Sequence, residues 1–520
     1  MRITNKIIEN NSMSNIYKNK ALEDKLNTQM ASGKKIARPS DDPVIAIRAL
    51  RLRSTLAEVT QYRDKNVEDA DSWLKTTEDA VNSIAGVLED MLEQCNTGSN
   101  KKLTTQNRQA ILENLKALRD EVYASGDADY AGRGLFTGYR TGTKLRFQED
   151  TTQEYSITEE FDKTALDDIT YIKMDNGTTT LGEINAGNYT DADYAIADTA
   201  VSQQKVHRLR LSYDNLEAGN VPVITYYNGA GSTPQNIPVT VVSKYAAGTD
   251  PYLQAQELEK GDTKAHAVFI PETGELILSD KAYQALSTTR DYKTTDIDES
   301  KFSVTYTKKN WENGDLRPEH YFQCVEDPAG KAVKHNYDKT AGNQVISYDV
   351  GFNQELRVNT LASECYTHDV GRDVDDMIAV LEQVDDVETV VSTLEKVIAD
   401  TNTSDTDRAI AEKSLAAANK ALTFLTEKMQ TAFENGITKM QGYLDKTTLA
   451  ITNIGTRSSK LELVKTRLTS QKTNFKDLVA DNEQADTAEV ATNLKSAQLA
   501  YDAALMSTAK VTQNSLMNFI

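Results

Sequence analysis

The side chains best suited to catalysis or metal binding are scattered along this chain of 520 residues. No two histidines stand four apart, the helical spacing at which two imidazoles can share a metal ion. The three cysteines are odd in number and far apart, so no disulfide framework or zinc spacing is visible. We therefore expect no metal, no cofactor and no histidine-based chemistry. These residues are His207, His266, His320, His335, His368, Cys95, Cys324 and Cys365.

The segment Gly132-Arg133-Gly134, followed by Gly138, has a superficial likeness to a phosphate-binding loop. It lacks the glycine spacing of such loops and the Lys-Ser or Lys-Thr that follows them, so we predict a turn. Acidic residues are too plentiful for any pair to stand out as a general acid and base. We expect that the protein is not an enzyme.

The net charge of −20 argues against a nucleic-acid partner, because phosphate contact needs a basic surface. The charge is unevenly spread: residues 1–53 hold eleven Lys or Arg against five acids, about +6. This end could attract the acidic remainder of another copy head to tail. It could equally be a basic face that is merely solvated.

No stretch approaches the roughly 20 apolar residues of a membrane span, so we expect no membrane insertion. The N-terminal residues also lack the apolar run of a secretory signal peptide. By these rules alone the chain is expected to be cytosolic.

A long heptad repeat in the N-terminal third predicts one helix of about 50 residues over 45–92. A parallel apolar row takes over one position later, as expected when a 3.6-residue turn drifts against a repeat of seven. The first series is Ile45, Leu52, Val59, Asn66, Trp73, Ala80 and Val87, and the row that takes over is Val67, Leu74, Val81 and Leu88.

Before this helix, a short segment carries two prolines, and each proline favours extended geometry in the residue before it. Asp42 can cap the helix and Pro43 can take its first position, where a missing N–H costs nothing. We predict a bent connector between two helices, although a plain helix start would have the same signals. The predicted connector is Arg38, Pro39, Ser40, Asp41, Asp42 and Pro43.

The C-terminal third also carries helical stripes, at 415–429 and 454–478, and a further helix is predicted between 373 and 400. Three glycines, Gly436, Gly442 and Gly455, each cost up to about 1 kcal/mol in a helix interior. We expect a break or frayed join there. A second N-terminal helix is expected after residue 102.

The middle of the chain, 146–350, is richer in Gly, Thr, Tyr and Asn and contains short β-type runs. The clearest runs are 221–227, 237–242 and 302–306, with turn signals at Asn228-Gly229 and Asn313-Gly314.

The predicted fold is mainly α with a β-rich insertion. The long N- and C-terminal helices are expected to pair in a coiled-coil rod from which one or more outer β-rich domains project. The expected divisions are 1–42 and 483–520 for an inner coiled-coil domain, 43–145 and 351–482 for a helical rod domain, and 146–350 for the insertion.

Both chain ends carry thin apolar stripes that a single helix cannot bury, so they need partners. We predict that the two ends pack on each other, in one subunit or between neighbours, and order on assembly. An ordinary intramolecular bundle is the alternative. The predicted assembly residues are Ile3, Ile7, Leu22, Leu26, Met30, Leu494, Tyr501, Leu505 and Leu516.

Strings near both ends, taken together and in order, resemble the hook-associated protein 3 family of bacterial flagellin relatives. The resemblance covers roughly 1–145 and 350–520. The strings that carry it are Met1 to Asn5, Gln29 to Ile36, Arg38 to Pro43, Gly132 to Gly138, Gly455 to Arg457, Leu461 to Leu463, Arg467-Leu468, Ala485-Asp486, Ala500 to Leu505 and Phe519-Ile520.

This resemblance implies a structural subunit joining hook to filament outside the cell, at the bacterial flagellum. It implies hook-associated protein 1, flagellin and further copies of itself as partners, and a flagellar export chaperone at the C-terminal region. It also implies type III export without a cleaved signal, in place of the cytosolic placement above. A flagellin-type filament subunit and a cytoplasmic coiled-coil scaffold remain the alternatives.

Overall fold

The computed structural model describes residues 5–100, 103–176, 179–227, 233–246, 248–262, 264–288, 301–327, 335–337 and 344–517. The chain divides into two compact units. We call residues 1–71, 348–356 and 459–520 the terminal unit, and residues 72–347 and 357–458 the central unit.

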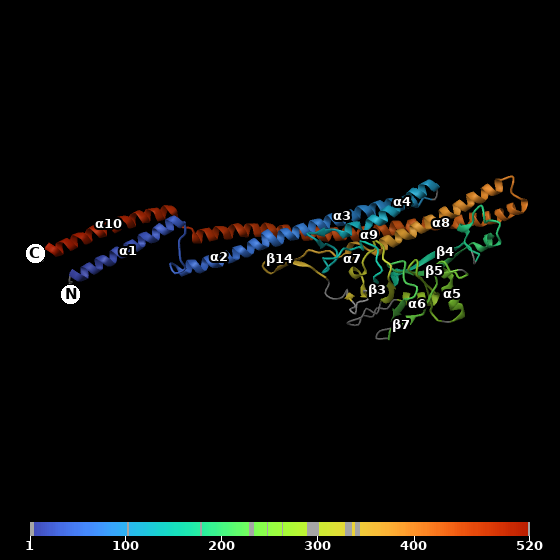
Figure 1. The fold of residues 1–520 in the computed structure, drawn as a ribbon, viewed down its shortest axis with the longest axis horizontal. Coiled ribbons are helices and arrows are strands. Elements are labelled where there is room, and N and C mark those ends of the chain that lie inside the picture. Colours follow the sequence, from blue (N-terminus) through green and yellow to red (C-terminus); the bar gives the residue numbers. More distant parts are fainter. Residues whose placement is uncertain are drawn as a thin grey trace. The chain divides into compact units, whose positions relative to one another are not determined.

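In the terminal unit the first and last helices lie side by side. Helix α1 (Asn5–Ser32) runs antiparallel to α10 (Thr487–Met517), as Figure 1 shows at the ends marked N and C. Midway along the pair the Asn19 side-chain amide donates to the carbonyl of Ala500, and just beyond one end the backbone N–H of Lys35 donates to the carbonyl of Glu483. Residues far apart in sequence therefore form one helical pair.

The long helix predicted over 45–92 is present, and it extends from residue 43 to residue 98. It consists of α2 (Pro43–Gln61), a π-helical turn η1 (Tyr62–Asn66) and α3 (Val67–Gly98). A π-helical turn holds one extra residue, so it moves the apolar row by one position. The row that starts at Val67 is buried from that point on. The sequence drift predicted from the heptad is thus concentrated at one turn.

In the central unit, helices from the N-terminal part of the chain pack against α8 through both polar and apolar side chains. α4 (Thr105–Val122) lies against α8 (His368–Ala399), where the buried Arg108 pairs with Asp385 at 2.9 Å. On α3, the Cys95 sulfur lies 3.6 Å from the Met377 sulfur of α8.

The break expected at the C-terminal glycines is wrong, because α9 runs without interruption from Asp405 to Glu483. Gly436 has a packing reason: a Cβ there would lie 2.8 Å from the Met377 sulfur and 3.2 Å from the Cys95 sulfur. The helix thus tolerates a glycine where three helices approach closely. Gly442 and Gly455 meet no such neighbours. Their unfavourable helix propensity is offset by the packing of other residues along the helix.

The β-rich middle forms two larger sheets. One has the order β13-β12-β3-β11-β6-β7 and the other β4-β5-β10-β9-β8. Their strands are β3 Glu154–Phe161, β4 Leu166–Lys173, β5 Ser202–Arg210, β6 Val223–Tyr226, β7 Gln235–Ile237, β8 Val239–Val241, β9 Ala267–Ile270, β10 Glu275–Leu278, β11 Phe302–Lys308, β12 Gln323–Asp327 and β13 His335–Tyr337. We call the described residues from β3 to β13 the β region.

Smaller elements complete the central part of the chain. β1 (Asp129–Tyr130) pairs with β2 (Arg133–Gly134), which confirms the turn predicted at the glycines. β14 (Ser347–Gly351) pairs with β15 (Gln354–Arg357). The short helices are α5 Pro251–Gly261, α6 Asp280–Ser287, α7 Ala362–Cys365, η2 Ala124–Asp127, η3 Lys163–Ala165, η4 Leu181–Glu183, η5 Ala192–Tyr194, η6 Asp198–Ala200 and η7 Pro318–His320.

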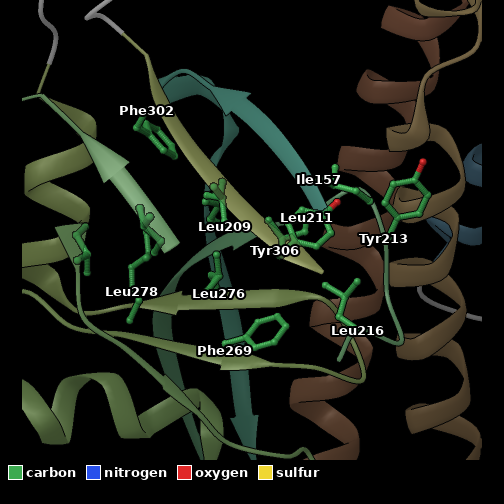
Figure 2. Packing of buried hydrophobic residues seen from close by; sticks show 14 of the residues in the cluster. Ile157, Leu209, Leu211, Tyr213, Leu216, Phe269, Leu276, Leu278, Phe302 and Tyr306 are labelled. Carbon is green, nitrogen blue, oxygen red and sulfur yellow. The ribbon is translucent and has the colours of Figure 1, made fainter. Parts of the chain in front are cut away.

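The two sheets share a core. Along β11 every second residue is buried, the period-2 pattern of a strand with one face inward. Figure 2 shows Leu209 and Leu276 of the five-stranded sheet in one cluster with Tyr306 of the six-stranded sheet. The β region is therefore held together by its own apolar interior.

The predicted mixture of long helices and a β-rich middle is confirmed. The three predicted β runs fall on β6, on β7 with β8, and on β11. At the Asn313-Gly314 turn, Gly314 has a φ of +103°, a conformation that favours glycine. The turn predicted at Asn228-Gly229 lies outside the described residues.

Candidate assembly surface

Within the described residues no group of three or more His, Cys, Asp or Glu side chains is arranged to hold a metal ion. The three cysteines are buried, and burial raises the pKa of the Cys95 thiol to about 12. A thiol with so high a pKa is a poor nucleophile. None of the described helices is long and apolar enough to span a membrane.

The histidines have structural surroundings. His207 stacks on Tyr283, with ring centroids 3.9 Å apart, and its Nδ1 lies 2.6 Å from an Asp168 oxygen. Burial lowers the pKa of His320 to about 4, which keeps that ring neutral near pH 7. His368 Nε2 lies 2.9 Å from the Tyr213 hydroxyl. His266 Nε2 lies 3.7 Å from Asp262, and the side chain of His335 is not among those described.

A cleft of about 440 Å³ lies beside η7 in the β region. Its charged side chains neutralise one another: Glu319 lies 3.1 Å from Arg317 and 3.6 Å from Arg140. This arrangement stabilises a turn and presents no activated nucleophile.

The α1–α10 pair has a narrow apolar seam. On α1 the side chains that are buried or half-buried recur at helical spacing: Ser12, Ile16, Asn19, Glu23, Leu26 and Gln29. Leu26 of α1 packs against Val490, Leu494 and Ala497 of α10. Farther along, the Lys20 ammonium lies 5.8 Å from the ring centroid of Tyr501. Four of these six α1 side chains are polar, so the pair has little apolar area with which to hold itself together.

Most predicted assembly residues on α1 lie off this seam. Leu26 is 7% exposed, whereas Ile7 and Leu22 are each 48% exposed and Met30 is 44% exposed. On α10, Leu505 is 42% exposed, while Leu494 and Tyr501 are half-buried. Ile3 lies outside the described residues, and the side chain of Leu516 is not described. The structure therefore brings Leu26 to Leu494. It leaves Ile7, Leu22, Met30 and Leu505 exposed within the subunit.

The predicted connector follows the end of α1. Gly33, with a φ of +66°, ends the helix, and the segment from there to Asp42 is non-helical and largely exposed. The Asp41 carboxylate accepts hydrogen bonds from the backbone N–H of Arg38 at 2.8 Å and of Ala37 at 3.0 Å. These bonds, that of Arg38 above all, lower the pKa of Asp41. The segment is thus a turn organised by its own aspartate. Pro39 and Ser40 lie within this turn and are exposed.

Asp42 ends the connector and caps α2. Its backbone is extended, and its side chain accepts from Val44 N–H at 2.9 Å and Ile45 N–H at 3.1 Å. Pro43 takes the first helical position. Asp486 plays the same part for α10, because it accepts from the N–H groups of its second and third following residues. Each terminal helix joint is therefore set by one aspartate cap.

Beside the connector, α2 pairs with the end of α9 through polar contacts. The Arg53 guanidinium pairs with Glu483, and the Asn482 amide donates to the carbonyl of Ile45 at 3.2 Å. Ala46 and Ala49 are the buried side chains of this part of α2. The large apolar residues of the same turns point elsewhere.

Those residues form an exposed row on α2. Val44, Ile47 and Leu50 are 68%, 54% and 67% exposed, three aliphatic side chains within two helical turns. The heptad did not predict this row, because it identifies only the positions of the helix that face inward. These apolar residues are spaced three apart and lie off the heptad positions. That spacing was the sequence signal that could have indicated the row.

We name the exposed large apolar residues of the four terminal-unit helices the candidate assembly surface. It consists of Ile7, Ile8, Met13, Tyr17, Leu22, Met30, Val44, Ile47, Leu50, Leu463, Leu478, Leu499, Leu505 and Met506. Soluble monomers rarely expose so much apolar surface in one part of the chain unless it meets another molecule.

The chain matches the model of the bacterial flagellin N-terminal helical region over residues 3–141. Flagellar hook-associated protein 3 of Salmonella typhimurium is 28% identical over 142 residues, which are 27% of this chain and 44% of that protein. A flagellin of Clostridium tyrobutyricum is 24% identical over 204 residues, 38% of this chain and 54% of that protein. The chain spans about half the length of these curated relatives.

Among solved structures, a putative flagellar hook-associated protein from Vibrio parahaemolyticus aligns with this chain. The alignment covers 85% of this chain and 100% of that protein's chain. The identity is 14% and the TM-score 0.34, too low to add evidence. The N-terminal match and the curated relatives confirm the predicted resemblance. Residues 3–141 of this chain are thus similar to the bacterial flagellin N-terminal helical region, and 27% of the chain is similar in sequence to hook-associated protein 3.

Proposed function

We propose that this protein is a non-enzymatic structural subunit of the bacterial flagellum that joins hook to filament. The observation that carries the proposal is the candidate assembly surface, nine of whose fourteen residues lie on α1 and α2, within the residues 3–141 that match the flagellin N-terminal region. The similarity to hook-associated protein 3 supports a junction role in particular.

The mechanism we propose is packing of both chain ends in a coiled coil, within a subunit and between neighbouring subunits. Within the subunit, Leu26, Val490 and Ala497 form the seam. Ile7, Leu22, Met30 and Leu505 would meet other subunits, because each is 42–48% exposed in its own. Burying one such side chain contributes roughly 1.5–3 kcal/mol, so a ring of subunits would gain stability that an isolated pair of helices lacks.

In this scheme residues 1–42 and 483–520 form an inner domain and 43–145 with 351–482 form a rod. Residues 146–350 form the outer β-rich insertion, and the connector of Arg38 to Pro43 links inner domain and rod. Caps at Asp42 and Asp486 support a fixed joint at this boundary.

The partners that fit this role are hook-associated protein 1, flagellin and further copies of the chain. A flagellar export chaperone would hold the C-terminal region before export through the type III apparatus. Leu499, Leu505 and Met506 of α10 are the exposed apolar residues that such a chaperone would cover. The assembled protein would then be extracellular.

Deletion of the gene, followed by electron microscopy and assay of the medium for flagellin, tests the junction role. Hooks without filaments, with unpolymerised flagellin released, are the expected result. Complementation with the full chain should restore filaments. Normal filaments in the deletion strain would contradict the proposal and favour a cytoplasmic scaffold.

A flagellin-type filament subunit is the second candidate, since the match to the Clostridium tyrobutyricum flagellin covers more of the chain than the hook-associated match does. The two roles differ in abundance. Immunogold labelling along the whole filament would support a filament subunit, whereas labelling confined to the hook end would support the junction role.

A further inference from the structure

A cluster of charges lies where the β region meets α8 in the central unit; three of its four side chains are buried, and that of Asp376 is 38% exposed. Arg208 and Arg210, on β5, reach the carboxylates of Asp373 and Asp376, on α8. The Asp376 Oδ2 atom lies 2.9 Å from Arg208 Nη2 and 2.7 Å from Arg210 Nη1. Arg210 also pairs with Asp373. The side chains of the two arginines are 7% and 9% exposed. We call these four residues the ionic latch.

On each side of the latch, groups from neighbouring elements hold the latch residues in place. On the sheet side, Arg208 lies 2.7 Å from Glu275 of β10 and 3.2 Å from Asp167 of β4. The Tyr252 hydroxyl of α5 donates to Glu275 at 2.7 Å. These contacts fix the arginines to the β region, whatever happens at the helix.

On the helix side, two groups of α9 hold Asp373. The Lys439 ammonium lies 2.9 Å from Oδ1, and the Tyr443 hydroxyl donates to Oδ2 at 2.6 Å. Arg372 of α8 adds a neighbouring pair, 3.2 Å from Asp214. Both halves of the latch are thus pre-formed and meet as two charged surfaces.

Electrostatics show how strongly the two halves depend on each other. Burial alone would raise the pKa of Asp376, but Arg208 and Arg210 hold it well below its usual value. Burial alone would likewise lower the pKa of Arg210, yet Asp376 and Asp373 raise it. Either half alone would leave a buried charge without its counter-ion, which is costly.

This interface is more polar than the cores on either side of it, although His368 of α8 also packs on the rings of Tyr213, Tyr321 and Phe322 there. The β region has an apolar interior between its two sheets, and α8 packs on the other helices through side chains such as Met377. Apolar burial stabilises both. A buried ion pair, in contrast, gains little net stability, because desolvation offsets most of the attraction.

From this contrast we propose that the ionic latch is a conformational device that holds the folded β region against α8 and α9. When the latch loses a charge, the β region opens as one unit, while its sheets and the helices stay folded. Such local opening below the global unfolding free energy is the behaviour of a separate cooperative unit.

Hydroxyl-radical footprinting of the full chain, read by mass spectrometry, tests this in Asp376→Asn. The variant keeps the shape of the side chain and removes its charge. We expect labelling of Tyr252 and Tyr443, which flank the latch, to rise several-fold. Labelling of Phe269 and Tyr306 inside the β core should stay at the wild-type level, and the far-UV circular dichroism should be unchanged.

Lys116→Ala is the matched control, because it removes a pair to α8 that is exposed on both sides, Lys116 with Glu382 at 3.0 Å. It should leave every label unchanged. Arg210→Gln, which also removes one latch charge, is a second variant, usable if Asp376→Asn does not fold, and should raise the same two labels. Unchanged labelling at Tyr252 and Tyr443 in the folded variants would overturn the proposal. A rise at Phe269 and Tyr306 equal to that at the latch would also overturn it, since the β region would then not open as a folded unit.

Discussion

The terminal unit and the central unit are both built with long helices, yet they treat apolar side chains in opposite ways. Of the twenty large apolar side chains that are exposed among the described residues, fifteen belong to the terminal unit, the smaller of the two. In the central unit such residues are mostly buried, in the helical core and between the sheets. The comparison teaches that the central unit covers most of its large apolar side chains itself, whereas the terminal unit leaves many of them exposed.

The seams explain the difference in residue terms. Along α1 only Ile16 and Leu26 of the six seam residues are apolar, whereas along α3 the row from Leu74 to Leu88 is fully buried. Since helices owe most of their stability to packing, α1 and α10 should be the less protected. The predictions below test that contrast, from the largest expected effect on unfolding to the smallest.

The largest effect is expected in the β core. Phe269→Ala should destabilise the central unit by about 3–5 kcal/mol, because it leaves a cavity at a fully buried ring. Chemical denaturation followed by tryptophan fluorescence would measure it, since Trp311 lies in the same cluster. Amide exchange in α1 and α10 should stay at the wild-type rate. Faster exchange there would break the contrast between the units.

A pH effect should also belong to the central unit. Burial raises the pKa of Glu159 to about 7 from its ordinary 4.5, although Tyr306 and Ser212 donate hydrogen bonds to it. Because the folded value is the higher one, this carboxyl contributes stability below the unfolded pKa that is lost as pH rises through the folded pKa. The Tm of wild type relative to Glu159→Gln should therefore fall from pH 4.5 to pH 7. A constant difference would contradict this assignment.

A smaller effect is expected at the joint of the terminal unit. Asp42→Ala removes the side chain that caps α2 and should cost about 1 kcal/mol, while Asp42→Asn should retain most of it. Amide exchange at Val44 and Ile45 would report the loss. Exchange at the wild-type rate in Asp42→Ala would mean that the Asp42 side chain does not cap α2.

The smallest effect on unfolding, and the largest on assembly, is expected at the exposed row of α2. Ile47→Asp should change monomer stability by no more than about 0.5 kcal/mol, because the side chain is 54% exposed. It should nevertheless abolish filament attachment and swimming. Tyr245→Asp, at a residue of the central unit that is 80% exposed, is the control and should swim normally. Motility in Ile47→Asp would show that this row is not part of the assembly surface.

Limited proteolysis would sharpen the comparison further. In the monomer, α1 and α10 should be cut well before the helix of α2 and α3, because their seam is narrow. Termini that resist cleavage as long as that helix does would contradict ordering on assembly and favour an ordinary bundle.

The sequence by itself determined the elements whose signals are local or periodic. The apolar repeat predicts the long helices, and the turn at Gly132 and the cap at Asp42 follow from what glycine and aspartate do to a backbone. The strings at both ends carried the family resemblance. Such features depend on residues close together in the chain, so they can be read without a fold.

Only the tertiary structure decided which apolar side chains are covered. Leu26 and Leu22 look equivalent in the sequence, and only the packing of α10 buries one and leaves the other exposed. The same holds for Gly436, which predicted a break but lies where three helices approach, and for the ionic latch, whose charges come from β5 and α8. These outcomes depend on contacts between residues far apart in the chain, and no local propensity encodes them.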